Sequence, residues 1–221
     1  MPRSKFQEQL ATLRADVLSM GDLVRHRYRQ ALEAIETGDE EVARQVVEGD
    51  HAVNERYLAL EGDCIDLFAL QQPVAGDLRL VASSFKLLTD LERVGDLAAN
   101  LAECAGHTGA DRYPSVDVGE IGEFADGMLA DALAAYESGD ADACRAVAAR
   151  DDELDARCAA AAEVVFQNLL RTGDAVDREV VVDDAISLTL VVRDLERVGD
   201  HAVNVAARTL YALEQDPELV Y

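Results

Sequence analysis

The sequence predicts an all-α protein, a tandem duplication of an antiparallel three-helix bundle with six long helices and a pseudo-twofold axis. Three observations lead to this fold class. Apolar residues recur at spacings of three and four along almost the whole chain, whereas period-two alternation is nearly absent. The chain has four prolines, which leaves long stretches free to form helices. A seven-residue acidic segment occurs twice without change, which indicates an internal repeat.

Short breaks in the apolar pattern define the six helices. A Gly-Asp step is typical of one helix ending at glycine and the next beginning at an aspartate N-cap. The predicted breaks are Thr37-Gly-Asp39, Gln72-Pro73, Gly106-His-Thr-Gly109, Ser138-Gly-Asp140 and Thr172-Gly-Asp174. The predicted helices span residues 4–37, 39–70, 76–106, 117–138, 140–171 and 177–214.

The repeat divides the chain into two predicted domains. The segment Asp90-Leu-Glu-Arg-Val-Gly-Asp96 recurs as Asp194-Leu-Glu-Arg-Val-Gly-Asp200. Glycine, proline and serine concentrate in the stretch between the third and fourth predicted helices, as expected of a linker. We therefore expect one three-helix repeat at residues 1–110 and a second at residues 111–221.

The composition restricts the classes of partner. The chain carries 44 acidic and 20 basic residues, for a formal net charge of −24, and 49% of its residues are apolar. This apolar content is enough for a core and excludes a disordered acidic tail. A surface this acidic suits neither phosphate backbones nor anionic lipids, so we expect no nucleic-acid partner and no direct membrane insertion. Many carboxylates with two lysines, Lys5 and Lys86, also favour a halophilic, archaeal origin.

Several motif classes are missing from the sequence. There is no signal-peptide pattern, no apolar run long enough to span a membrane and no CxxC pair among the four cysteines. We therefore expect a soluble, cytoplasmic protein with reduced cysteines. There is also no phosphate-binding glycine loop and no nucleophile motif, so we do not expect an enzyme.

The repeated segment places two acidic pairs at the edge of a buried helical stripe. These pairs are Glu92 with Asp96 and Glu196 with Asp200. Like charges one turn apart destabilise a helix, as does the mid-helix glycine of each copy. Their retention in both copies suggests a role as oxygen ligands for hard divalent cations, which favours Mg, Mn or Fe(II) over zinc. The alternative is structural: an ion-pair ladder of Asp90, Arg93 and Asp96, with Gly95 admitting a neighbouring helix.

Other oxygen donors lie near these pairs in the predicted bundle. Asp50 and Asn54 on the second helix correspond to Asp151 and Asp155 on the fifth, and each of these helices neighbours the helix that carries the repeated segment. Asn100 and Asn204 continue the rows of the acidic pairs as neutral donors.

A ferritin-like di-iron oxidase is the alternative function. Glu48 and His51 form an ExxH step, as in di-iron bundles, but such sites need two of these motifs and two further inward glutamates. The second repeat has Val198 three residues before His201, so the sequence supplies one ExxH. We therefore interpret His51 as an exposed polar residue.

These motifs together resemble the PhoU family of phosphate-transport and phosphate-signalling accessory proteins. The resemblance spans about residues 7–212 and rests on the two repeated segments, on Val47-Glu-Gly-Asp50-His-Ala-Val-Asn54 and on Gln72-Pro-Val-Ala-Gly-Asp77-Leu-Arg-Leu-Val81. It implies paired three-helix bundles with multinuclear metal clusters on E(D)xxxD carboxylates. The residues that match this motif are Glu92, Asp96, Asp151, Asp155, Glu196 and Asp200. Asn54 departs from it, so a weaker or differently occupied first site is expected.

The resemblance also implies a function. Members of the family act as negative regulators of phosphate uptake when phosphate is plentiful. The implied partners are the ATPase subunit of a phosphate ABC transporter and, in bacteria, a membrane-bound sensor histidine kinase. We further expect a homodimer and a divalent or multinuclear metal, with Fe, Mn, Mg and Zn as the candidates.

Overall fold

The described part of the chain is helical and contains no strand. The computed structural model describes residues 3–71, 75–109, 113–171, 178–216 and 218–219. The helices are α1 (Arg3–Thr37), α2 (Glu40–Glu48), α3 (Asp50–Gln71), α4 (Ala75–Glu103), α5 (Val118–Ser138), α6 (Ala141–Ala148), α7 (Asp151–Arg171) and α8 (Arg178–Glu214). The predicted breaks at Gln72-Pro73 and Thr172-Gly-Asp174, and the predicted boundary between residues 110 and 111, lie outside the described residues.

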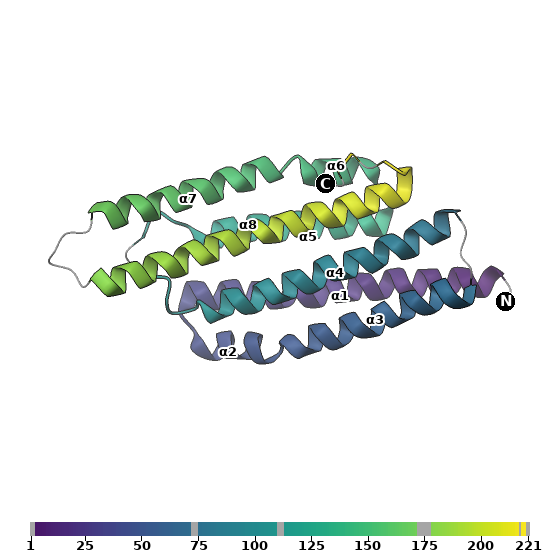
Figure 1. Cartoon of the computed structure of the whole chain (residues 1–221), viewed down its shortest axis with the longest axis horizontal. Coiled ribbons are helices and arrows are strands. Elements are labelled where there is room, and N and C mark those ends of the chain that lie inside the picture. Colours follow the sequence, from purple (N-terminus) through teal and green to yellow (C-terminus); the bar gives the residue numbers. More distant parts are fainter. Residues whose placement is uncertain (1–2, 72–74, 110–112, 172–177, 217, 220–221) are drawn as a thin grey trace.

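The helices form six antiparallel rods, because α2 with α3 and α6 with α7 each act as one interrupted helix. The six rods form two three-helix bundles, which confirms the predicted fold class (Figure 1). In two of the rods the structure differs in detail from the sequence prediction. The predicted helix 39–70 is divided into α2 and α3 at Gly49, and the predicted helix 140–171 into α6 and α7 at Ala149. Both residues keep right-handed helical φ and ψ angles. Each break is therefore a local tightening of the helix, and neither residue adopts a non-helical backbone conformation at the break. As a result Asp50 and Asp151 each begin a new helix.

The predicted Gly-Asp caps at residues 38–39 and 139–140 are present. Gly38 and Gly139 adopt left-handed φ angles of 68° and 69°, a conformation that favours glycine. The Asp39 side chain accepts hydrogen bonds from the backbone N–H groups of Glu41 and Val42, and Asp140 accepts one from Ala143. These caps satisfy N–H groups that the first turn leaves without intrahelical partners.

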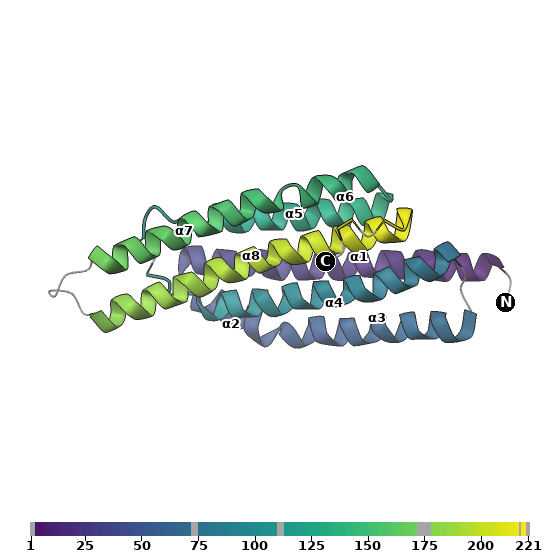
Figure 2. The same cartoon turned by 45° about the horizontal axis from the view of Figure 1, so that its top comes forward.

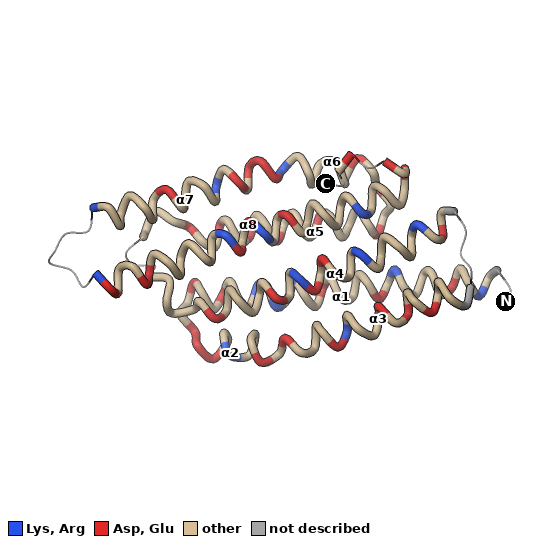
Figure 3. The backbone as a smooth tube through the Cα atoms, viewed as in Figure 1, with Lys and Arg blue, Asp and Glu red and all other residues tan. Residues whose placement is uncertain are grey.

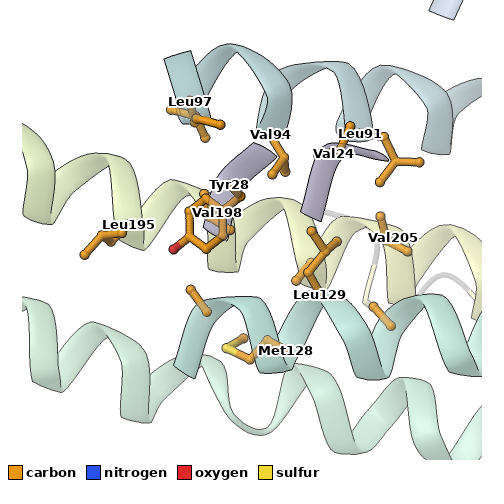
Figure 4. Close-up of a cluster of buried hydrophobic side chains, with 14 of the residues drawn as sticks. Val24, Tyr28, Leu91, Val94, Leu97, Met128, Leu129, Leu195, Val198 and Val205 are labelled. Carbon is orange, nitrogen blue, oxygen red and sulfur yellow. The ribbon is translucent and has the colours of Figure 1, made fainter. Parts of the chain in front are cut away.

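The two bundles share one core. Within the first half α4 packs on α1 and α3, and within the second half α8 packs on α5, α6 and α7. The halves meet along α4 with α8 and along α1 with α5. Figures 1 and 2 show α4 and α8 side by side at the centre of the elongated molecule. Buried side chains from α1, α4, α5 and α8 converge between the halves, so the repeats form a single hydrophobic unit (Figure 4).

An ion-pair cluster ties α1 to α5. The buried Asp126 carboxylate accepts two hydrogen bonds from Arg25, both at 2.9 Å, and one from Arg29 at 2.9 Å. One turn away, the Tyr28 hydroxyl donates to the Gly122 carbonyl at 3.1 Å. Because the bidentate Arg25 fork matches the carboxylate, this cluster fixes the register between the halves. None of the described helices has the length and apolarity that a membrane-spanning segment needs.

Glycines in the repeated segments allow close contact between helices. A Cβ on Gly95 of α4 would lie 2.9 Å from Val53 Cγ1 of α3. A Cβ on Gly199 of α8 would overlap the Leu154 side chain of α7. Val53 and Leu154 are both buried, so each glycine admits an apolar side chain from the helix that carries the other candidate ligands.

We predict that Gly199→Ala lowers the free energy of unfolding by about 1–3 kcal/mol, because the new methyl group overpacks the contact with Leu154. Gly62→Ala is the matched control: Gly62 is exposed on α3 with open space where a Cβ would stand. Alanine there should stabilise the protein by about 0.5–1 kcal/mol through its higher helix propensity. Urea unfolding of the three proteins measures both effects. Equal effects of the two substitutions would contradict this account of Gly199.

Candidate metal centre

Two clusters of oxygen donors lie where the helices of each half approach closely. The first acidic ridge consists of Asp50 and Asn54 on α3 with Glu92 and Asp96 on α4. The second acidic ridge consists of Asp151 and Asp155 on α7 with Glu196 and Asp200 on α8. Acidic residues are spread over all helices, so acidity alone does not mark these positions (Figure 3). Most of the ridge carboxylates are half-buried, whereas Asp155 and Asp200 are exposed.

The second acidic ridge concentrates negative charge. Loss of solvent contact raises the pKa of Asp151 from 3.8 to about 6, and repulsion from Asp155 and Asp200 adds to the shift. The same two causes, with Asp155 as the strongest repelling neighbour, raise the pKa of Glu196 and Asp200. His201 and Arg197 partly offset the shift of Asp200. The four carboxylates therefore lie within electrostatic reach of one another across the contact between α7 and α8.

Both ridges contain a buried carboxylate oxygen without a hydrogen-bond partner. These atoms are Asp50 Oδ1 and Asp151 Oδ1, at equivalent positions of the two repeats. Buried polar atoms in folded proteins are nearly always hydrogen-bonded, so two equivalent exceptions call for an explanation. A hard divalent cation is a partner that suits carboxylate oxygens. The ligand chemistry and the orphaned oxygens thus fit a divalent metal.

The side chains are not pre-arranged around a point. Within the described residues, no three His, Cys, Asp or Glu side chains are grouped closely enough to hold a metal ion. The carboxylates of each ridge instead face one another from neighbouring helices, with mutual repulsion opposing their convergence. A cation would have to draw them together by side-chain rotation.

The first acidic ridge is already partly paired. The Asn54 amide donates to Asp50 Oδ2 at 2.8 Å. Arg93 lies 3.2 Å from Asp96 and 3.6 Å from Glu92, so the proposed ion-pair ladder exists in part. Loss of solvent contact and repulsion from Asp96 raise the pKa of Glu92, while Arg93 opposes the shift.

The remaining predicted donors lie elsewhere. Asn100 is exposed on α4. The Asn204 amide donates to Asp90 Oδ1 at 3.1 Å, and His201 Nδ1 lies 3.0 Å from the same oxygen. Asp90 therefore faces α8 and joins the two halves, which differs from the alternative in which it belongs to an ion-pair ladder with Arg93. This role of His201 was not predicted; the one signal for it in the sequence is that His201 stands where the first repeat has Leu97.

The ExxH step does not form a di-iron half-site. Glu48 is the last residue of α2 and His51 lies in α3, so the two residues are not on one continuous helix. Both side chains are exposed, and His51 Nδ1 lies 2.7 Å from the Glu48 backbone carbonyl oxygen. Di-iron bundles need such residues to point inward. The structure therefore offers no support for the ferritin-like alternative.

The fold and the ridges define a class: a duplicated three-helix bundle with a carboxylate cluster at the same place in each copy. The family model described as PhoU domain matches the chain twice, at residues 17–105 and 118–209. The chain therefore belongs to the PhoU family.

Individual relatives cover the chain nearly end to end. The phosphate-specific transport system accessory protein PhoU homolog of Pseudomonas putida is 32% identical over 210 residues, which are 94% of this chain and 80% of the relative. The crystal structure of PhoU from Pseudomonas aeruginosa has a TM-score of 0.87 at 30% identity and covers 96% of this chain and 100% of its own. The phosphate transport system regulatory protein PhoU from Streptococcus pneumoniae also has a TM-score of 0.87, at 26% identity, with coverages of 96% and 98%.

We predict that Asp151→Asn stabilises the metal-free protein at pH 7 by about 1 kcal/mol, a value that allows for solvent screening of this partly exposed group. Because the pKa of Asp151 is raised on folding, its protonated form contributes stability below pH 3.8, and that contribution is lost as the pH rises through about 6. The uncharged amide retains it.

Unfolding in chelator at pH 4 and pH 7 measures this difference, which should shrink as the pH falls toward 4. The control is Asp142→Asn, whose carboxylate is 99% exposed and should leave the pH profile unchanged. An Asp151→Asn protein with the same profile as the parent would contradict the raised pKa of Asp151 in the folded protein.

Proposed function

We propose that the chain is a cytoplasmic adaptor that restrains phosphate uptake when phosphate is plentiful. The observation that carries the proposal is the PhoU-domain match in both halves, together with relatives named as accessory or regulatory proteins of phosphate transport. The proposed partner is the ATPase subunit of a phosphate ABC transporter, with a sensor histidine kinase as a second partner where one exists. A homodimer is part of the proposal.

The surface of α8 supports a role in protein contacts. Val182, Ile186 and Leu190 recur every fourth residue near the start of α8 and are exposed. Exposed apolar residues in a row on one helix face are typical of a contact surface for another protein. No catalytic role is proposed for the chain, because an adaptor needs such a surface and no reaction.

We also propose that divalent cations bind at the acidic ridges. In the second half the proposed ligands are Asp151, Asp155, Glu196 and Asp200. The equivalent carboxylates of the first half are Asp50, Glu92 and Asp96. Oxygen donors favour Mg, Mn or Fe(II), and zinc is the least suited of the four candidates. A bound cation would supply positive charge that offsets the repulsion between α7 and α8, so the ridge would stiffen the bundle without taking part in a reaction.

The test is a pull-down from phosphate-replete cells with the tagged full-length chain. We expect the wild type to recover a phosphate-transporter ATPase. A variant without the carboxylate pairs of α4 and α8 should recover at least about tenfold less ATPase if the cation stiffens the contact surface. This variant carries Glu92→Gln, Asp96→Asn, Glu196→Gln and Asp200→Asn.

A charge-matched control separates a ridge effect from a loss of net charge. It carries Glu8→Gln, Glu40→Gln, Glu137→Gln and Asp142→Asn, all exposed and outside the ridges. This control should recover the ATPase as the wild type does. Failure of the wild type to recover either an ATPase or a kinase would overturn the adaptor proposal.

A further inference from the structure

The two acidic ridges occupy equivalent positions but differ in their charges. The alignment is fixed by Thr37-Gly-Asp39 and Ser138-Gly-Asp140, and it pairs residues 27–54 with residues 128–155 without a gap. It pairs Asp50 with Asp151, Asn54 with Asp155, Gly49 with Arg150 and Arg27 with Met128. The last three pairs differ in charge, and the pair Asn54 and Asp155 belongs to the ridges themselves.

Arg27 places a buried positive charge at the α2–α3 junction, next to Asp50 of the first acidic ridge. Its side chain reaches from α1 and is 7% exposed. One terminal nitrogen donates to the Val46 carbonyl, the other lies where a Cβ on Gly49 would stand, and Nε has no hydrogen-bond partner. Arginine stays charged in proteins, and a buried charge needs compensation. Asp50 supplies it by electrostatic attraction.

Among the described residues, the second acidic ridge has no buried arginine at the equivalent position. Met128 occupies the position equivalent to Arg27 and is fully buried. The arginine of this half is Arg150, which lies outside the ridge: it pairs with Asp131 at 2.5 Å and stacks on Phe124 at 4.6 Å. In the described part of the chain, none of the four ridge carboxylates forms an ion pair. The exchange of Arg27 and Gly49 for Met128 and Arg150 thus moves the guanidinium from the buried α2–α3 junction next to Asp50 to a position against Asp131 and Phe124.

The number of ligands differs as well. The first acidic ridge has three carboxylates, of which Asp50 is bound by the Asn54 amide and the other two pair with Arg93. The second has four carboxylates, and none of them forms an ion pair with a described residue; the unpartnered buried oxygen, Asp50 Oδ1 or Asp151 Oδ1, is common to both ridges. The affinity of a carboxylate site for divalent cations depends on the charge of its ligands. The first acidic ridge has one carboxylate fewer and one buried positive charge more than the second, and both differences lower its affinity for a cation.

We propose that the two ridges are inequivalent: Arg27 is an internal cation that takes the place of a metal charge in the first, so divalent cations bind at the second. This inference rests on the proposed metal binding. Arg27 is a positioning residue that binds the α2–α3 junction next to Asp50, and the metal site of the protein is the contact between α7 and α8.

The test measures Mn²⁺ binding to the full chain by titration calorimetry, with bound manganese counted after dialysis. Glu196→Gln with Asp200→Asn should weaken binding by about tenfold or more. Glu92→Gln with Asp96→Asn, the matched pair in the other half, should change it less than about twofold. Equal losses in the two variants would overturn the inequivalence while leaving metal binding in place. A wild type that binds no manganese would overturn metal binding and this inference together.

A gain-of-function variant tests Arg27 itself. Arg27→Met with Asn54→Asp gives the first acidic ridge the residues of the second, and about twice as much manganese should then be retained. Adding Glu92→Gln and Asp96→Asn should remove the extra metal. Asn54→Asp alone leaves the α1 packing intact and should give a smaller gain in bound manganese. This single variant serves as the test if circular dichroism shows that the double variant is poorly folded. No gain in either variant would overturn the role of Arg27.

Discussion

The close packing of α7 against α8 at Gly199 is the contact on which the second acidic ridge depends. Leu154 is fully buried and lies where a side chain of residue 199 would stand. Burying a leucine contributes about 1.5–3 kcal/mol, whereas a pair of like charges one turn apart on a helix opposes folding by a few tenths. Packing therefore outweighs repulsion, and the carboxylates on both sides of the contact are held near one another without a cation.

The duplication supplies two copies of this arrangement, and the copies have diverged in charge. Asp90 of the first copy faces α8, with Asn204 and His201 against it. Its counterpart Asp194 is buried beside Arg193 of its own helix. The same repeated segment thus joins the halves through one copy and pairs within its own helix in the other. The pseudo-twofold symmetry holds for the backbone and the core, and it fails where polar side chains meet between or beneath the helices.

Much of the fold could be predicted from the sequence because its causes are local. Apolar spacing gave the helices, and Gly38-Asp39 and Gly139-Asp140 gave the caps. The divisions at Gly49 and Ala149 could not be predicted, because both residues stay in the helical region and the break depends on the packing of neighbouring side chains. The position of the ridges at the edge of a buried stripe was also predictable, since it follows from helical periodicity.

The charges beneath and between the helices could not be predicted in the same way. Arg27 belongs to α1, and its contact with the Gly49–Asp50 junction exists only after the bundle has formed. The one signal in the sequence is a charged residue next to Tyr28 in an otherwise apolar row. Asn204 shows the same limit: periodicity placed it in the row of Asp200, while the packing of α4 on α8 turns its amide to Asp90.

A crystal structure of the protein with manganese, with anomalous diffraction data, would locate the bound cations. We expect an anomalous peak between α7 and α8 with carboxylate ligands from both helices, and a weak peak or none at the first acidic ridge. Manganese bound only to the exposed acidic coat, or at the first ridge in preference to the second, would overturn the inequivalence of the two ridges.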